Sequence, residues 1–216
     1  MKRNLFIYTA AIVVTVFFAS CGGSKNNSTD NAKQESETVK NLKSAINGET
    51  TASTKYAAFS KKAKEEGFMA ISKLFEATSK SEAIHAQNHL KVLEGLGVKY
   101  EAKVDTFTVN STSENLQAAL KGEKYEVETM YPGFIKQGEA DKEDKAVQSF
   151  NYAFDTEKKH IKLYQSALDL LDASKEKTLP AEYYVCPKCG FTYDNKDVKE
   201  NCELCGTSKE KFFAIK

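Results

Sequence analysis

The chain has 216 residues, which is enough for one domain of ordinary size and a second, small one. Its 31 Lys and Arg residues balance its 30 Asp and Glu residues, so there is no strong field of one sign and nucleic acid is not expected as a partner. Hydrophobic residues make up 41% of the chain, a share typical of a globular protein, and no internal apolar run is long enough to span a bilayer.

The first 20 residues have the layout of a secretory signal. Two basic residues precede an apolar stretch from Leu5 to Phe18 that is short for a membrane span. Cleavage after Ser20 would put bulky Phe18 where a small residue is expected, whereas FASC resembles the lipobox of bacterial lipoproteins. We therefore expect a signal peptide over 1–20, lipidation of Cys21, and an exported protein held by lipid on the periplasm-facing side of a cell membrane. The alternative is an uncleaved N-terminal anchor helix.

The segment after this signal is polar and low in complexity, reading GGSKNNSTDNAKQES over 22–36. Such a composition does not build a packed core and is typical of a flexible linker. Residues 21–36 are therefore predicted to be a flexible tether.

Two predicted helices follow the tether. Apolar residues spaced three and four apart indicate a helix from Thr38 to about Lys64 and another from about Phe68 to Glu94. Gly67 lies between them and suits a helix stop.

Two more predicted helices follow a connection at 97–111 that lacks helical periodicity. Ser111 and Glu114 form a possible capping box at the start of the third helix, and Pro132 is expected to kink that helix or weaken one of its turns. The fourth helix is expected from about Asp141 to Leu171. The chain is thus predicted to be mainly α, with four long helices.

Acidic and imidazole side chains interrupt the apolar stripes of all four predicted helices. No Lys or Arg lies in these stripes, and a buried carboxylate is unfavourable unless something pairs with it, so a cation has to be supplied. In four-helix bundles two metal ions fill this role, held by one Glu from each of two helices and by Glu-x-x-His from each of the other two. The residues that reproduce this set in chain order are Glu49, Glu82, His85, Glu123, Glu157 and His160, with Glu126 one turn from Glu123.

The two Glu-x-x-His segments are SEAIH at 81–85 and EKKH at 157–160. The spacing of three places the carboxylate and the imidazole on one helix face, so both can reach the same pair of ions. A single segment of this kind is more often a solvated Glu–His pair. The position of both segments on apolar helix stripes is what favours a metal site. Ligation by many carboxylates and two imidazoles favours iron or manganese over zinc. His89 has no Glu three residues before it and is interpreted as a neighbour of the site or an ordinary packed histidine.

The C-terminal segment carries two Cys-x-x-Cys-Gly knuckles separated by 12 residues. Four thiolates at this spacing predict a tetrahedral metal site, in which this segment alone slightly favours structural zinc over iron, with disulfides as a third option. The four cysteines are Cys186, Cys189, Cys202 and Cys205. The aromatic residues expected to form the core around them are Tyr183, Tyr184, Phe191, Tyr193, Phe212 and Phe213.

A helical bundle followed by two cysteine knuckles closely resembles the rubrerythrin family. The segments that carry the resemblance are NLKSAINGET at 41–50, SEAIHA at 81–86, GEKYEVETMYP at 122–132 and EKKH at 157–160. It covers residues 37–216 and implies a ferritin-like four-helix diiron domain over 37–178. A small rubredoxin-like domain of strands and metal knuckles is implied over 179–216.

The resemblance also implies how the metal ligands are shared. Glu82 and Glu157 would bridge two iron ions. The remaining ligands would be Glu49 with either His85 or Glu126 on one iron, and Glu123 with His160 on the other. In the family the first iron exchanges its histidine for the extra glutamate on oxidation, and both candidates are present here.

Other implied roles lie around the diiron centre. Tyr56 and Tyr131 match tyrosines that hydrogen-bond the ligating carboxylates in the family. The four cysteines would hold one mononuclear iron, with zinc as the alternative.

The activity implied by the resemblance is an NADH-linked peroxidase that reduces hydrogen peroxide to water. Electrons would pass from the Fe(Cys)4 site to the diiron pair, in a homodimer or larger homo-oligomer in which one chain's rubredoxin-like domain lies against the other chain's diiron site. An exported protein has no nicotinamide pool, so its electron-donor protein is unidentified. The alternatives are ferritin-like oxidation and storage of ferrous iron, and a non-enzymatic zinc or iron redox-sensing module.

Overall fold

The computed structural model describes residues 35–172 and 174–216. The predicted signal peptide, Cys21 and the tether up to residue 34 lie outside the described residues. Within the described ranges, no helix combines the length and the apolar character that crossing a membrane requires.

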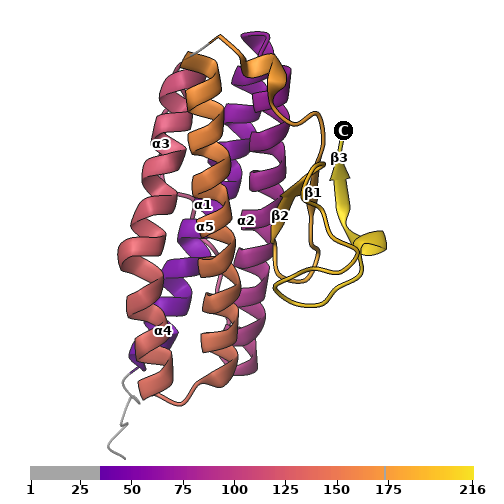
Figure 1. Cartoon of the computed structure of the whole chain (residues 1–216). Coiled ribbons are helices and arrows are strands. Elements are labelled where there is room, and N and C mark those ends of the chain that lie inside the picture. Colours follow the sequence, from indigo (N-terminus) through magenta and orange to yellow (C-terminus); the bar gives the residue numbers. More distant parts are fainter. Residues whose placement is uncertain (1–34, 173) are drawn as a thin grey trace, which may run out of the picture. The chain divides into compact units, whose positions relative to one another are not determined.

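The first two helices are α1 (Glu37–Glu65) and α2 (Met69–Gly95), which pack against each other along much of their length (Figure 1). The Ser36 hydroxyl caps α1 by accepting a hydrogen bond from the backbone N–H of Val39. Gly67 ends the first helix, as its sequence position predicted, with a left-handed φ of 88° that glycine adopts without strain.

The third predicted helix is divided into three pieces. They are α3 (Thr112–Tyr125), a π-helical turn η1 (Glu126–Met130) and α4 (Tyr131–Ala140). The predicted capping box is present, because the Ser111 hydroxyl accepts from the Glu114 N–H and the Glu114 carboxylate accepts from the Ser111 N–H.

Just before Pro132, where a kink or a weakened turn was expected, the helix contains a π turn. The backbone N–H of Tyr131 bonds to the carbonyl of Glu126, five residues back instead of four. Pro132 has no N–H and stands in the first turn of α4, where no intrahelical donor is needed. The extra residue in the turn changes which side chains face the interior at the end of α3.

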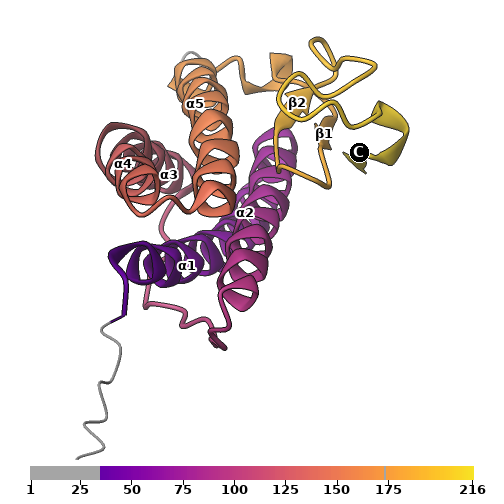
Figure 2. The same cartoon turned by 90° about the horizontal axis from the view of Figure 1, so that it is seen from below.

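The last long helix is α5 (Asp144–Asp172), which packs against α2, α3 and α4. Seen from below, α1, α2, α5 and the α3–α4 segment surround a common interior (Figure 2). The predicted mainly α class with a four-helix bundle is therefore confirmed.

The C-terminal region forms a small antiparallel sheet in the order β2-β1-β3. Its strands are β1 (Tyr183–Val185), β2 (Thr192–Asp194) and β3 (Phe213–Ile215), with short helical turns η2 (Glu176–Thr178) and η3 (Lys209–Lys211). The central strand β1 lies against α2 (Figure 1).

The sequence suggested that the aromatic residues of this region form one small core, but the structure shows that not all of them do. Tyr183 is fully buried and packs into the apolar cluster of the helical bundle, together with Val185. Phe213 is 40% exposed, with the Lys80 ammonium 4.3 Å from the centre of its ring. The side chains of β1 thus pack the cysteine region against the helical bundle.

Candidate metal centres

The acidic and imidazole side chains predicted on four helix seams converge inside the bundle. Each is at most 1% exposed, although helix side chains of this kind are normally solvated. They come from α1 (Glu49), α2 (Glu82, His85), α3 (Glu123) and α5 (Glu157, His160).

His85 faces three of these carboxylates. Its Nδ1 atom lies 2.8 Å from Glu157 Oε1 and 3.0 Å from Glu82 Oε2. Glu49 Oε2 lies 3.8 Å from the same nitrogen. The four residues form a group whose ligand atoms all lie within 4.8 Å of one another.

His160 has the corresponding place in a second group. Its Nδ1 atom lies 2.7 Å from Glu157 Oε2 and 3.2 Å from Glu82 Oε1. Glu123 Oε1 lies 3.9 Å away. Glu82 and Glu157 therefore each turn one oxygen toward each histidine, which is the arrangement that a carboxylate needs to bridge two ions.

The cluster fits a pair of cations because its buried polar atoms lack other partners. Buried polar groups in folded proteins are nearly always hydrogen-bonded, and an unpaired buried charge is strongly unfavourable. Among the described residues, the atoms at this site without a hydrogen-bond partner are both oxygens of Glu82 and Glu157, Oε2 of Glu49 and Glu123, and Nδ1 of His85 and His160. Two cations would give every one of these atoms a ligand bond.

The protonation of the cluster is also shifted by its burial. Burial raises the pKa of Glu49 to about 7 and, with the neighbouring carboxylates, raises the pKa of Glu123 well above its ordinary range. Burial alone would lower the pKa of both histidines, but the surrounding carboxylates outweigh it and raise the pKa of His85 and His160 well above the usual value. Metal binding would displace the protons held by these groups.

The outer nitrogens of both histidines are held by the cysteine region. His85 Nε2 lies 3.1 Å from the carbonyl oxygen of Cys189, which can only accept, so Nε2 carries the hydrogen. His160 Nε2 lies 3.0 Å from Thr192 Oγ1, whose hydrogen goes to the carbonyl of Gly190 at 3.2 Å. Both rings therefore direct Nδ1 at the carboxylates, and once a cation displaces the proton on Nδ1, its lone pair has the orientation of a metal-ligating histidine.

Tyr56 and Tyr131 lie beside the cluster, where the resemblance placed them. The Tyr56 hydroxyl donates to Glu123 Oε1 at 2.8 Å, and the Tyr131 hydroxyl donates to Glu49 Oε1. Each phenol thus occupies one carboxylate oxygen, Oε1, and leaves the other, Oε2, buried without a hydrogen-bond partner.

Glu126 stands apart from the other predicted ligands. It is the first residue of η1, is partly exposed, and belongs to neither group of ligand atoms. Although part of the residue is exposed, its carboxyl group is buried, and this burial, followed by the charges of Glu49 and Glu123, raises the pKa of the carboxyl well above the usual range. The carboxyl therefore lies within electrostatic reach of the cluster. Its exchange with His85 stays a prediction.

The structure also shows contacts of this site that the sequence did not single out. His89 is fully buried, with Nε2 3.2 Å from the Tyr131 hydroxyl and Nδ1 2.8 Å from Ser149 Oγ. Its spacing of four from His85 puts it on the same face of α2, a signal that was present in the sequence. Nothing in the sequence pointed to Ser149 or to Thr192, because their partners are far along the chain.

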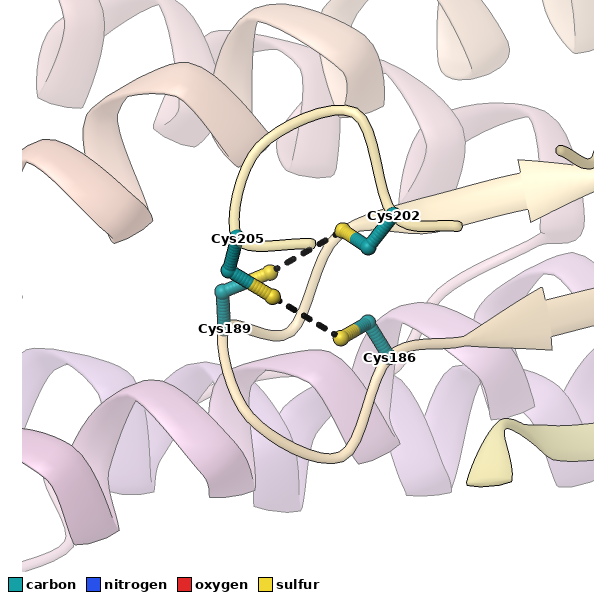
Figure 3. Close-up of side chains that lie close together, drawn as sticks. All are labelled: Cys186, Cys189, Cys202 and Cys205. Carbon is teal, nitrogen blue, oxygen red and sulfur yellow. Dashed lines mark hydrogen bonds between the residues drawn. The ribbon is translucent and has the colours of Figure 1, made fainter. Parts of the chain in front are cut away.

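The four cysteine sulfurs also converge. Cys186 Sγ lies 3.4 Å from Cys205 Sγ, and Cys189 Sγ lies 3.5 Å from Cys202 Sγ. Figure 3 shows the side chains pointing toward one another from two loops, and all four sulfur atoms lie within 4.8 Å of one another. All four are free thiols, and these spacings are close to the roughly 3.8 Å between sulfurs in a tetrahedral site with metal–sulfur bonds of about 2.3 Å.

We expect aerobically purified protein to be red, because ferric iron held by four thiolates absorbs visible light through thiolate-to-iron charge transfer. The check is a visible spectrum together with iron and zinc analysis. Colourless protein with one zinc per chain would contradict iron at the cysteines and favour a structural or sensing role for this region.

Comparison with known proteins gives matches to one family. A model of the rubrerythrin family matches residues 40–168. Rubrerythrin-2 of Clostridium acetobutylicum is 36% identical over 178 residues, which cover 81% of this chain and 94% of that protein. Nigerythrin of Nitratidesulfovibrio vulgaris is also 36% identical over 178 residues, covering 82% of this chain and 86% of that protein.

Solved structures agree with these relatives. Nigerythrin in a mixed-valence state superposes with a TM-score of 0.75 at 32% identity, covering 93% of this chain and all of that one. Its fully reduced, all-ferrous state gives the same values. A bacterioferritin from Rhodobacter capsulatus matches with a TM-score of 0.59 at 19% identity, covering 63% of this chain and 86% of that one, a likeness of fold alone.

Proposed function

The chain belongs to the rubrerythrin family, and we propose on this basis that it is a peroxidase that reduces hydrogen peroxide to water. The family's diiron site corresponds to the buried carboxylate and imidazole cluster, and the four-cysteine cluster is able to bind an iron ion. The protein is thus a diiron redox protein. Its use of peroxide and the relay of electrons through the cysteine site are the proposed part.

One observation carries the proposal, namely the contact between the two centres. Cys189 supplies a thiol to the four-cysteine cluster, and its carbonyl oxygen accepts a hydrogen bond of 3.1 Å from His85, whose other nitrogen faces the carboxylates. A single hydrogen bond and a few covalent bonds therefore link the two centres. An iron-storage protein has no need of such a link, whereas an enzyme that must refill its diiron site with electrons does.

The contact is made within one chain. The homo-oligomer implied by the resemblance, with one chain's cysteine domain on another chain's bundle, therefore remains a proposal, as does the electron-donor protein that would reduce the cysteine site.

The residues of the chain supply the surroundings that such a reaction needs. When bound, two ferrous ions supply the two electrons that break the O–O bond of peroxide. The carboxylates balance the charge of the ions, and their near-complete burial keeps bulk water away from the reacting atoms. The reduction of one peroxide to two waters also consumes two protons, which must enter this buried site.

The test is a single turnover of the fully reduced, iron-loaded protein with a stoichiometric amount of hydrogen peroxide under anaerobic conditions. We expect peroxide to disappear and the red colour of the cysteine site to return as its electron passes to the diiron pair. Loss of peroxide while the cysteine site stays reduced would contradict the relay. Uptake of ferrous iron in large excess over these sites would instead support the storage alternative.

We further propose that a lipid on Cys21 tethers the enzyme to the membrane. The 15 residues between Cys21 and Glu37 are polar and low in complexity, a composition typical of a linker between an anchor and a folded domain. Stable anchoring needs two or more acyl chains, since one chain binds only weakly.

We expect Cys21→Ser to release the protein from the membrane fraction, or to leave it unprocessed, without changing its metal content. Cell fractionation and mass spectrometry of the mature N-terminus measure this. Unchanged membrane association with Met1 still present would favour the uncleaved anchor instead. Protein found only in the cytoplasm would contradict both forms of anchoring.

A further inference from the structure

The proposed reaction needs protons at a cluster whose side chains are at most 1% exposed. The hydrogen bonds that the two histidines make outside the cluster cannot supply these protons. The one from His85 ends on the backbone carbonyl of Cys189, and the one from His160 passes through Thr192 to the carbonyl of Gly190. A carbonyl oxygen has no hydrogen to pass on, so both routes end there.

The two tyrosines beside the cluster offer the other routes. Tyr56 donates to Glu123, and among the described residues no further hydrogen bond leads away from its hydroxyl. Tyr131 is different, because its hydroxyl also lies 3.2 Å from His89 Nε2.

This second route continues outward through His89. The imidazole Nδ1 lies 2.8 Å from Ser149 Oγ on α5. Glu49, Tyr131 and His89 are fully buried, whereas Ser149 is 6% exposed. The chain of hydrogen bonds therefore runs from the edge of the core to a carboxylate of the cluster.

In each hydrogen bond of this route, the chemistry of the two groups determines which one donates. An ionised Glu49 carboxylate can only accept, so Tyr131 donates its one hydrogen to it. The phenol oxygen must then accept from His89 Nε2–H, and the free lone pair on Nδ1 accepts from the Ser149 hydroxyl. Burial, and then the charge of His85, lowers the pKa of His89 to about 3, so the ring is neutral with one hydrogen. All three donors point toward Glu49.

We propose that Ser149, His89 and Tyr131 form a proton relay that supplies the Glu49 side of the diiron site during peroxide reduction. This rests on the proposed peroxidase activity. In one passage Tyr131 gives its hydroxyl proton toward Glu49 and receives the Nε2 proton of His89. His89 Nδ1 then holds the proton of Ser149, which takes a new one from solvent.

The balance of this step is one proton delivered per passage, with no lasting change of charge on the three residues. The two electrons come from the ferrous ions, and two passages provide the two protons that turn the cleaved peroxide into water. Each passage leaves the hydrogen of His89 on Nδ1. Before the next passage the hydroxyls rotate back, and the ring regains its Nε2–H form by losing the Nδ1 hydrogen to water and taking one on Nε2. The His89 ring packs against Tyr131 and Phe150, with ring centres 6.0 and 5.3 Å away, which keeps it aligned with both hydroxyls.

The first test compares peroxide turnover of wild type, His89→Phe, His89→Gln, Ser149→Ala and Ser149→Thr, all iron-loaded. We expect His89→Phe and Ser149→Ala to be at least about tenfold slower with unchanged iron content, because both break the route. Gln can still donate to Tyr131 but cannot pass a proton, so it should be slow too. Ser149→Thr keeps the hydroxyl and should stay close to wild type.

These variants separate the possible outcomes. His89→Gln at the wild-type rate would show that His89 only positions Tyr131 and would overturn the relay. Wild-type rates in both His89→Phe and Ser149→Ala would overturn it as well, while leaving the peroxidase proposal intact. Should His89→Phe fail to fold, Ser149→Ala decides alone. A wild-type protein that does not reduce peroxide would overturn the proposed function and the relay together.

A second test does not depend on turnover. Nitrogen NMR of histidine-labelled full-length protein, with zinc in the metal sites to avoid paramagnetism, reports which ring nitrogen of His89 carries the hydrogen. The relay requires Nε2–H and a hydrogen-bonded Nδ1 whose resonance shifts in Ser149→Ala. A hydrogen on Nδ1 would overturn it. The control is Tyr164→Phe, which removes a buried hydroxyl that donates to Thr78 Oγ1 at 2.6 Å and should leave both turnover and the His89 signals unchanged.

Discussion

Glu157→Ala should abolish peroxide turnover while leaving the helix content unchanged. Its two oxygens lie 2.8 Å and 2.7 Å from the Nδ1 atoms of His85 and His160, so it faces both halves of the site, and its loss would remove the carboxylate placed to bind both ions. Glu157 is fully buried, and its removal also takes away a buried charge that is unfavourable without metal, so the helices should remain folded. Peroxide consumption, iron per chain and far-ultraviolet circular dichroism measure the three quantities.

Companion variants show whether bridging is what matters. Glu157→Gln keeps the side-chain volume but replaces the carboxylate with a neutral amide, which is a poor bridge between two cations, so turnover should also be lost. Glu82→Ala should behave like Glu157→Ala. Glu76→Ala changes an exposed glutamate on the same helix as Glu82 and should have no effect. A Glu157→Ala protein that retains most of its activity would contradict the diiron assignment.

Gly190→Ala should cut electron flow between the two centres without removing a metal ligand. A methyl group at this position would collide with His85 Nε2 and would lie 2.9 Å from Ser81 Oγ. Neither atom can move away easily, because His85 is held in the cluster and Ser81 donates to the Gly190 carbonyl at 2.7 Å. The knuckle must therefore withdraw, and the hydrogen bond from His85 to the Cys189 carbonyl must break.

The measurement for this variant is stopped-flow absorption of the reduced, iron-loaded protein mixed with peroxide. We expect the red colour of the cysteine site to return much more slowly than in wild type, although the iron content is unchanged. The physical reason is that the variant loses the well-aligned hydrogen bond between the cysteine site, which gives electrons, and the diiron site, which receives them.

The second knuckle offers a matched control. Gly206 has a φ of 73°, close to the 82° of Gly190, but a methyl group there would meet no atom within 4 Å. Gly206→Ala shares the strain of a left-handed alanine, on the order of 1 kcal/mol, without the collision. Equal slowing in both variants would assign the effect to backbone strain, and a wild-type rate in Gly190→Ala would show that electrons do not need this contact.

The candidate diiron site was accessible from sequence because its information is local. A helix repeats every 3.6 residues, so the position of Glu49 or Glu157 on an apolar stripe already indicates that the side chain is buried. The same holds for Glu-x-x-His, whose two side chains share a face wherever the helix packs. The π turn before Tyr131 was not predicted, because the stability of such a turn depends on which tertiary neighbours the end of α3 contacts.

The amino-acid sequence by itself determined the helices, the ligand types and the two cysteine knuckles, since each depends on residues a few positions apart. Only the tertiary structure decided which carboxylates turn an oxygen to each histidine, because this depends on how four helices pack. It also decided that Cys189 meets His85, 104 positions away, and that Ser149 meets His89, 60 positions away. No local pattern encodes such pairs, since the chain brings them together only when the apolar faces of the helices and of β1 are buried against one another.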